Sequence, residues 1–159
     1  MKQLILVRHS DAESGSFSLP DINRRLTPEG KNKANLQVRR LLSGDLKPDL
    51  LITSTAKRAV ETTEIFSNVL KFRRSILQVS FLYEDFTTSD FFALLNEISE
   101  SVNTVILVGH NPTISVMASR LDPDVLVSFN PCSIGIFNIG SFWNSVSVGD
   151  SKMIEYFEG

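Results

Sequence analysis

The chain begins with a continuous apolar run, residues 4–7, that is followed directly by Arg8 and His9. Four large apolar residues without polar alternation are typical of a strand that is buried on both faces. Such strands occur in parallel sheets that helices cover from both sides, and these sheets bind ligands at the carboxyl ends of their strands. The first nine residues therefore predict an α/β fold and place Arg8 and His9 where chemistry is expected.

Two later segments repeat this pattern. Residues 49–53 and 104–108 are predicted to be buried strands, and the second of them is followed by Gly109 and His110. His110 thus holds the same place after its strand as His9 does after the first. Because parallel strands end at one edge of a sheet, we expect the two histidines to meet in one crevice.

Helical patterns separate the strands. Thr27 and Pro28 suit the N-cap and the first position of a helix, and Ser54 suits the N-cap of the next. The predicted elements are helices from Pro28 to Gly44, from Ser54 to Leu70, over 89–98 (capped by Ser89 or Asp90) and over 113–121; a weaker strand over 76–81; and an antiparallel tail over 133–139 and 145–156, with turns at 140–141 and 149–150. We expect one domain over residues 1–159, a three-layer α/β/α sandwich with a mostly parallel central sheet.

Charge and composition argue against several classes of protein. The 16 basic and 18 acidic residues give a net charge of −2, so no general attraction to nucleic acid or to an anionic membrane is expected. The single cysteine, Cys132, excludes an internal disulfide, and two histidines with one thiol are poor material for structural zinc. No apolar run approaches the length of a signal-peptide core or a membrane span. We expect a cytoplasmic protein that acts as a monomer.

Arg58 falls in the first turn of the predicted second helix. The helix macrodipole is positive at that end, so a cation there is disfavoured unless an anion lies nearby. Together with Arg8 and Arg24, this placement indicates a site that binds phosphate, whereas Arg25 is interpreted as a structural loop residue.

Four segments together carry a resemblance to a known family. In chain order they are Arg8-His9-Ser10, with serine for the glycine of an Arg-His-Gly motif; Arg24 to Gly30, with Arg25 for the proline of an Arg-Pro-Leu-Thr-x-x-Gly motif; Ser54 to Thr62, with Arg58-Ala59 inside it; and Gly109-His110-Asn111-Pro112. On these motifs the chain resembles the histidine phosphatase superfamily and, within it, the short SixA-type phosphohistidine phosphatases. The resemblance covers nearly the whole length and implies a phosphoglycerate mutase-like fold.

The resemblance also implies roles for the central residues. His9 is implied to be the nucleophile that carries the phosphoryl group in the intermediate. Arg8, Arg58 and His110 are implied to bind that group. Two guanidinium groups and an imidazole can compensate the charge on the equatorial oxygens of the transition state, so we expect neither a metal nor another cofactor.

Five further residues are assigned with alternatives. Arg24, Ser10 and Asn111 are candidates for contact with the substrate, although Ser10 and Asn111 can instead simply shape turns. Larger members of the superfamily use a carboxylic acid to protonate the leaving group, and Glu84 is the candidate here, with Asp85 as the alternative. A solvated loop charge is the competing interpretation of Glu84.

Three functions compete at this point. The first is a phosphatase acting on phosphohistidine of a phosphotransfer protein, the second a phosphatase or mutase of small phosphoesters, and the third a non-catalytic module that binds phosphoproteins. The segment 67–103 has room for one strand and one helix but not for an inserted cap over the site. An open site favours a phosphoryl group displayed on another protein, whereas the paired histidines and the arginines argue against the non-catalytic module.

Overall fold

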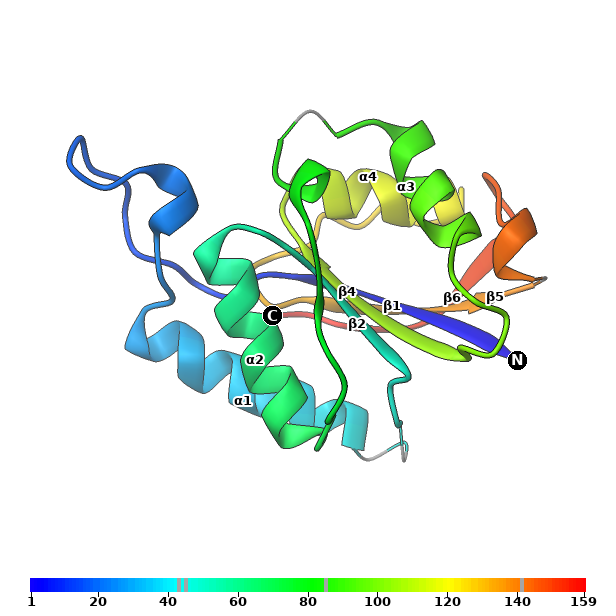
Figure 1. The fold of residues 1–159 in the computed structure, drawn as a ribbon, viewed down its shortest axis with the longest axis horizontal. Coiled ribbons are helices and arrows are strands. Elements are labelled where there is room, and N and C mark those ends of the chain that lie inside the picture. Colours follow the sequence, from blue (N-terminus) through cyan, green and yellow to red (C-terminus); the bar gives the residue numbers. More distant parts are fainter. Residues whose placement is uncertain (43, 45, 85, 141) are drawn as a thin grey trace.

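One mixed sheet forms the centre of the computed structural model, which describes all residues except Ser43, Asp45, Asp85 and Ser141. Its strands lie in the order β3-β2-β4-β1-β5-β6 (Figure 1). Their bounds are Lys2–Arg8 (β1), Leu50–Ser54 (β2), Leu77–Val79 (β3), Thr104–Gly109 (β4), Ile134–Ile139 (β5) and Ser151–Phe157 (β6). Neighbours among β3, β2, β4 and β1 pair in parallel, whereas β5 runs antiparallel to both β1 and β6. The predicted mostly parallel sheet and its antiparallel tail are confirmed.

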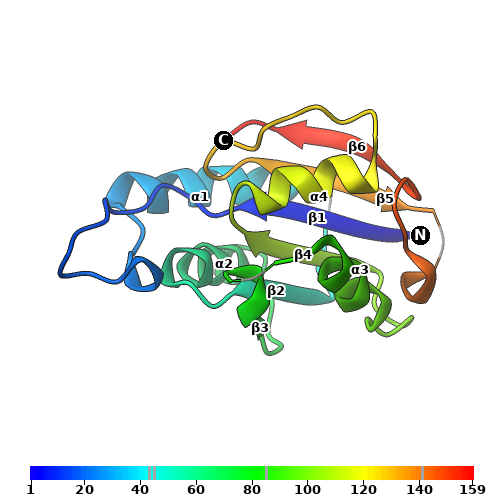
Figure 2. The ribbon, with the colours of Figure 1, turned by 90° about the horizontal axis from the view of Figure 1, so that it is seen from above.

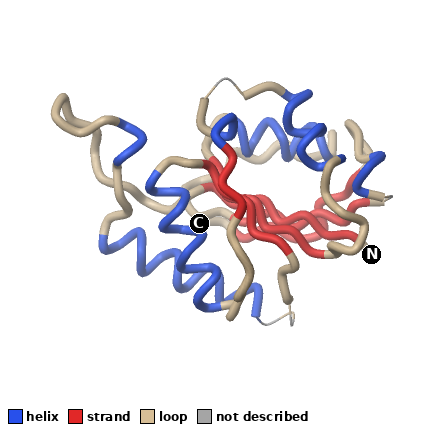
Figure 3. Tube along the Cα trace, viewed as in Figure 1, coloured by secondary structure: helices blue, strands red, loops and turns tan. Residues whose placement is uncertain are grey.

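Helices cover the sheet on both faces, as Figure 2 shows from above. They are α1 (Pro28–Leu42), α2 (Lys57–Val69), α3 (Thr88–Asn96) and α4 (Thr113–Leu121). Side chains alternate across a strand, so Ile5 and Val7 of β1 face α1 and α2, and Leu4 and Leu6 face α3 and α4. All four side chains are fully buried, which explains the unbroken apolar run. The three-layer α/β/α sandwich is therefore confirmed (Figure 3).

Two predicted helix caps are wrong. The N-cap of α2 is Ala56, not Ser54, and it makes no side-chain capping bond. Ser54 is the last residue of β2, and its hydroxyl instead contacts His110. In α3 the capping side chain is Thr87, which accepts a hydrogen bond from the backbone N–H of Asp90. The error at α3 arises because several Ser, Thr and Asp residues stand near the helix start and propensity alone cannot choose among them, whereas α2 begins without a capping side chain.

The weaker elements are shorter than predicted. The strand expected over 76–81 is limited to Leu77–Val79, and Ser80–Leu82 continues as a short 3-10 helix. The last strand begins at Ser151 and not at residue 145, and the start of the predicted strand overlaps another 3-10 helix, Trp143–Ser145, at Ser145. Trp143 is fully buried in this helix and donates its indole N–H to the carbonyl of Val102 at 2.7 Å. The turn at 140–141 includes Ser141, which lies outside the described residues.

A long loop between β1 and α1 projects beyond the carboxyl end of the sheet (Figures 1 and 2). At its base, Thr27 donates its backbone N–H to the carbonyl of Asp11 at 3.0 Å, and the Thr27 hydroxyl accepts from Gly30 N–H at 3.0 Å. The predicted N-cap role of Thr27 is confirmed. Gly30 lets the helix approach the loop closely, because a Cβ at this position would lie 2.1 Å from the carbonyl oxygen of Asp11. The start of α1 is thereby packed against the backbone that follows His9.

Gly30→Ala is expected to destabilise the protein by about 1–3 kcal/mol, because backbone atoms must move to relieve the contact with Asp11. Urea denaturation measures this loss. Gly44→Ala is the control, since its Cβ would meet its nearest neighbour at 3.8 Å, an ordinary contact. Equal stabilities of the two variants would show that the loop base yields without cost.

Within the described residues, no helix combines the length and the apolar composition that crossing a membrane requires.

Candidate active site

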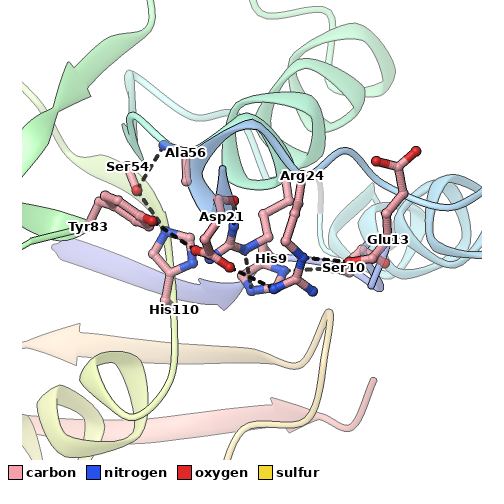
Figure 4. A network of polar contacts seen from close by, with 10 residues as sticks. His9, Ser10, Glu13, Asp21, Arg24, Ser54, Ala56, Tyr83 and His110 are labelled. Carbon is pink, nitrogen blue, oxygen red and sulfur yellow. Dashed lines mark hydrogen bonds and ion pairs between the residues drawn. The ribbon is translucent and has the colours of Figure 1, made fainter. Parts of the chain in front are cut away.

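Three strand ends and one helix start bring polar side chains together at the carboxyl edge of the sheet. His9 follows β1, Ser54 ends β2, His110 follows β4, and Arg58 lies in the first turn of α2. The rings of His9 and His110 have centroids 5.0 Å apart and are inclined by 54°. Figure 4 shows both rings in one cluster of polar contacts. The two imidazoles thus lie within the span of a single phosphoryl group.

The hydrogen bonds of His9 fix its tautomer. Its Nδ1 lies 2.7 Å from the carbonyl oxygen of Ser10, which can only accept, so Nδ1 carries the proton. Its Nε2 accepts from the Nε–H of Arg58 at 3.3 Å, so Nε2 carries the lone pair. The nitrogen that faces the arginine is therefore the one that can attack phosphorus.

The surroundings keep His9 neutral. Burial lowers its pKa to about 4, and the positive charges of Arg58, Arg8 and Arg24 act in the same direction. The hydrogen bond to the Ser10 carbonyl opposes this shift, because it favours the protonated ring. Near neutral pH the imidazole of His9 is thus unprotonated at Nε2, as a nucleophile must be.

His110 has one satisfied and one free ring nitrogen. Its Nε2 lies 2.7 Å from the hydroxyl of Ser54, which already accepts from the backbone N–H of Ala56 at 3.2 Å. A neutral ring that accepts from the Ser54 hydroxyl at Nε2 carries its proton on Nδ1, whereas a ring that donates to Ser54 from Nε2 has its lone pair on Nδ1. That nitrogen is buried and has no hydrogen-bond partner among the described residues. Burial, followed by the neighbouring His9 and Arg58, lowers the pKa of His110 to about 3.

Arg8 and Arg58 supply cationic donors from two sides. Arg8 donates through Nη1 to the carbonyl of Phe129 at 2.8 Å, while its Nε is buried and unpartnered among the described residues. Arg58 is buried, and besides its contact with His9 it donates to Asp21 through both terminal nitrogens. Buried donors without partners are costly unless a ligand satisfies them. The Nε of Arg8 and the Nδ1 of His110 have no partner among the described residues, and both are closed to solvent, so a ligand would reach them only after neighbouring side chains move.

Three residues of this cluster were not identified from the sequence. Ser54 was assigned to a helix cap and to a family motif but to no role in the site, Tyr83 was included in a loop, and Asp21 was not singled out. The Tyr83 ring packs edge-on against His110 at 5.7 Å between centroids, and the guanidinium carbon of Arg58 lies 5.8 Å from its centre. The Asp21 carboxylate contacts Arg24, Arg58 and Tyr83. An acidic residue three positions before Arg24 was the available sequence signal for Asp21.

The residues assigned to substrate contact have different surroundings. Arg24 lies at the site, with Nη1 2.8 Å from Asp21 Oδ1. The buried hydroxyl of Ser10 donates to the carbonyl of Gly30 at 2.7 Å, so its proton is not free for a substrate. Asn111 donates its side-chain amide to the Phe129 carbonyl at 2.8 Å and accepts from a serine of α4. Ser10 and Asn111 thus hold backbone in place, which matches the turn-shaping alternative.

The acid candidates lie in the loop after Leu82. Glu84 is exposed, and no side-chain hydrogen bond or ion pair of the described residues joins its carboxylate to His9, Arg58 or His110. Its neighbour Asp85 lies outside the described residues. Cys132 is fully buried, and burial raises the pKa of its thiol to about 12, so the thiol stays protonated and packs as a small apolar residue.

Other parts of the surface offer less chemistry. A hollow of about 600 Å³ lies at the opposite, amino ends of the strands, and Gln3, Asp49 and Thr104 help to line it. Neither histidine contributes to this hollow, so its size does not make it the reactive centre. Among the described residues, no group of three or more His, Cys, Asp or Glu side chains is arranged to hold a metal ion.

Comparison with known proteins assigns the family. A model of the histidine phosphatase superfamily (branch 1) matches residues 4–84, just over half of the chain. The chain belongs to the histidine phosphatase superfamily. Its matched region contains His9 and Arg58, the residues that the resemblance placed at the centre of the site.

Individual relatives cover different parts of this superfamily member. The serine/threonine-protein phosphatase PGAM5, mitochondrial, of Xenopus tropicalis is 39% identical over 69 residues, which are 43% of this chain and 24% of that protein. The chain thus spans about a quarter of that relative. The SixA structure from Agrobacterium tumefaciens is 21% identical, with a TM-score of 0.84 over 99% of this chain and 98% of that one. The protein histidine phosphatase SixA complexed with tungstate is also 21% identical, with a TM-score of 0.86 over 98% and 96%. Both structures share the fold of this histidine phosphatase.

The lowered pKa values of His9 and His110 predict that stability falls between about pH 6.5 and pH 4. In this window the unfolded chain protonates histidines of ordinary pKa near 6.5, whereas the folded protein keeps both rings neutral. Unfolding therefore binds protons, and each histidine contributes up to about 1.4 kcal/mol per pH unit. Urea denaturation at about pH 7 and about pH 5, in buffer without oxyanions, measures the loss.

His110→Gln provides the matched control for this prediction. The chain has only two histidines, so the variant should lose about half of the pH dependence. Equal stability of the original protein at both pH values would contradict the prediction.

Proposed function

We propose that this histidine phosphatase works without a metal, through a phosphohistidine formed on His9, and that it removes phosphoryl groups from phosphohistidine on a phosphotransfer protein. The single observation that carries the proposal is the unprotonated Nε2 of His9, set among the buried donors of Arg58, Arg8 and His110. A nucleophile and cationic donors at one point are what phosphoryl transfer requires.

The reaction proceeds in two displacements. The Nε2 lone pair attacks phosphorus, and the bond from phosphorus to the substrate imidazole, which is protonated at its other ring nitrogen, breaks as the new P–N bond forms, so that neutral imidazole leaves. During this step the His9 ring becomes positive, and its Nδ1–H donates to the Ser10 carbonyl, which stabilises that charge. A water molecule then attacks the phosphoenzyme, so that inorganic phosphate leaves and Nε2 regains its lone pair.

The guanidinium and imidazole donors take up the charge on the transferring group. The loose transition state places negative charge on three equatorial oxygens, and donors held before the reaction cost no reorganisation. Arg8 Nε and His110 Nδ1 are buried and unpartnered among the described residues, so phosphoryl oxygens would satisfy both. The charge that a metal ion would supply is thereby provided by side chains.

Two observations support a protein-borne phosphoryl group. Between α2 and β4 the described chain forms only β3, a short 3-10 helix and α3, which leaves the histidines without an inserted cap domain. The protein histidine phosphatase SixA has the same fold over 98% of this chain. An uncapped site admits a phosphohistidine ring presented by another protein.

A phosphoester substrate is the second candidate. The 39% identity with a serine/threonine-protein phosphatase over 69 residues favours it, because such a substrate carries its phosphate on a hydroxyl oxygen. The non-catalytic module is disfavoured, because a binding site alone does not require a neutral histidine directed at the anion.

Purified protein should hydrolyse a phosphohistidine protein faster than a sugar phosphate or an aryl phosphate, and EDTA should leave the rate unchanged. His9→Ala should abolish turnover and the phosphoenzyme, because the attacking nitrogen is removed. Release of inorganic phosphate and acid-labile labelling of the enzyme are the measurements. The control is Arg25→Ala, which removes an exposed side chain outside the cluster. Phosphoenzyme in His9→Ala, or loss of activity in EDTA, would contradict the mechanism.

Glu84→Gln should slow ester hydrolysis far more than phosphohistidine hydrolysis, if Glu84 is the acid. An alkoxide is as poor a leaving group as hydroxide, whose conjugate acid, water, has a pKa of about 15.7, so an ester needs a proton donor. Imidazole is a better leaving group, because its conjugate acid has a pKa of about 6.5. The two rates in the variant, with Asp85→Asn as control, give the comparison. Equal large losses on both substrates would defeat the leaving-group argument, and no loss on either would remove Glu84 from the site.

A further inference from the structure

The side chain of Asp21 lies among the groups that would hold a phosphoryl oxygen (Figure 4). Its Oδ2 accepts from Arg58 Nη2 at 3.0 Å and from the Tyr83 hydroxyl at 2.8 Å. Its Oδ1 accepts from Arg24 Nη1 at 2.8 Å, and its backbone carbonyl accepts from Arg58 Nη1 at 2.8 Å. One carboxylate therefore accepts hydrogen bonds from two arginines and a phenol at the same time.

This arrangement leaves Arg58 committed on three sides. Its Nε–H covers the Nε2 lone pair of His9, and both of its terminal nitrogens donate to Asp21. A phosphoryl group that is to be attacked must lie next to that lone pair and must also receive charge from Arg58. Binding of the substrate therefore requires that Arg58 exchange contacts with Asp21 or His9 for contacts with phosphoryl oxygens.

Of the ion pair between Arg58 and Asp21, the Asp21 side chain is the one free to move. The Arg58 side chain is 8% exposed and fixed in α2, whereas the Asp21 side chain is 51% exposed. Asp21 starts a three-residue 3-10 helix, Asp21–Asn23, that buries none of its residues and lies in the projecting loop (Figure 1). Hydrogen bonds from Arg24, Tyr83 and Arg58 lower the pKa of Asp21, so its carboxylate is charged at all working pH values.

We propose that Asp21 is an internal competitor for the anion site: its carboxylate holds Arg58 and Arg24 while the site is empty, and a phosphoryl group displaces it on binding. A phosphoryl group brings up to two negative charges and three oxygens, against one charge and two oxygens of the carboxylate. Singly charged anions gain nothing by the exchange, so Asp21 selects for phosphoryl and similar dianions. The inference rests on the proposed function only in taking this cluster as the phosphoryl site.

Equilibrium binding of tungstate, a phosphate-like oxyanion, tests the proposal without any turnover. Calorimetry at about 0.1 M salt compares the original protein with Asp21→Asn and with Glu13→Gln. Asp21→Asn should bind tungstate about fivefold or more tightly, on the scale of a partly exposed charge pair. Glu13→Gln removes the same charge from the same loop, but its carboxylate accepts from the backbone N–H of Arg25 and points away from the histidines, so binding should be unchanged.

A second variant separates competition from support. Tyr83→Phe removes one hydrogen bond to the Asp21 carboxylate, so it should tighten tungstate binding by a smaller factor than Asp21→Asn does. Weaker or unchanged binding in Asp21→Asn, with cooperative unfolding retained, would overturn the proposal and make Asp21 a support for Arg58. If Asp21→Asn binds tungstate more tightly but the original protein hydrolyses none of the tested phosphates, the competitor role of Asp21 is upheld and the proposed reaction is refuted. Failure of the competitor proposal can therefore be told apart from failure of the proposed function.

Discussion

The parallel pairing of β1 with β4 is the constraint on which the site depends. Its register places Arg8 opposite Gly109, and the backbone N–H of His9 then donates to the Gly109 carbonyl at 2.9 Å. The two strands therefore end side by side, and the residues that follow them are His9 and His110. A slip of one residue would carry each side chain of β1 to the other helical layer and would place a different residue opposite Gly109, so the distance between the rings depends on this register.

Burial then determines the charge state of both histidines. A charged imidazole at this depth would lose its hydration next to three arginines, so the neutral form is favoured. The same low polarity strengthens the attraction between the guanidinium groups and an incoming anion. One physical condition thus leaves His9 Nε2 unprotonated and strengthens the affinity of the arginines for an anion. Under the proposed function, the positive charge that is costly in the empty site stabilises the phosphoryl group.

The sequence predicted the parts of the molecule that depend on local pattern. Apolar runs located β1, β2 and β4, and Arg58 was correctly placed in the first turn of its helix, because strand and helix periodicity are local properties. Ser54 was misassigned because it ends β2 two residues before the N-cap of α2, where its hydroxyl contacts His110, 56 residues away, as well as the backbone N–H of Ala56. Asp21 and Tyr83 meet across 62 residues, and neither belongs to a periodic segment. Contacts between two loops depend on how the finished sheet places them, which no local pattern encodes.

The loop between β1 and α1 is anchored at its base and free at its tip. Backbone hydrogen bonds join Asp11 to Thr27 and Glu13 to Arg25, whereas residues 14–18 are exposed. Changes of length or composition within residues 14–18 would leave the strands and helices undisturbed. The same scaffold can therefore carry a different surface segment beside the cluster of Asp21, Arg58 and His9, while the strands that position the two histidines remain fixed.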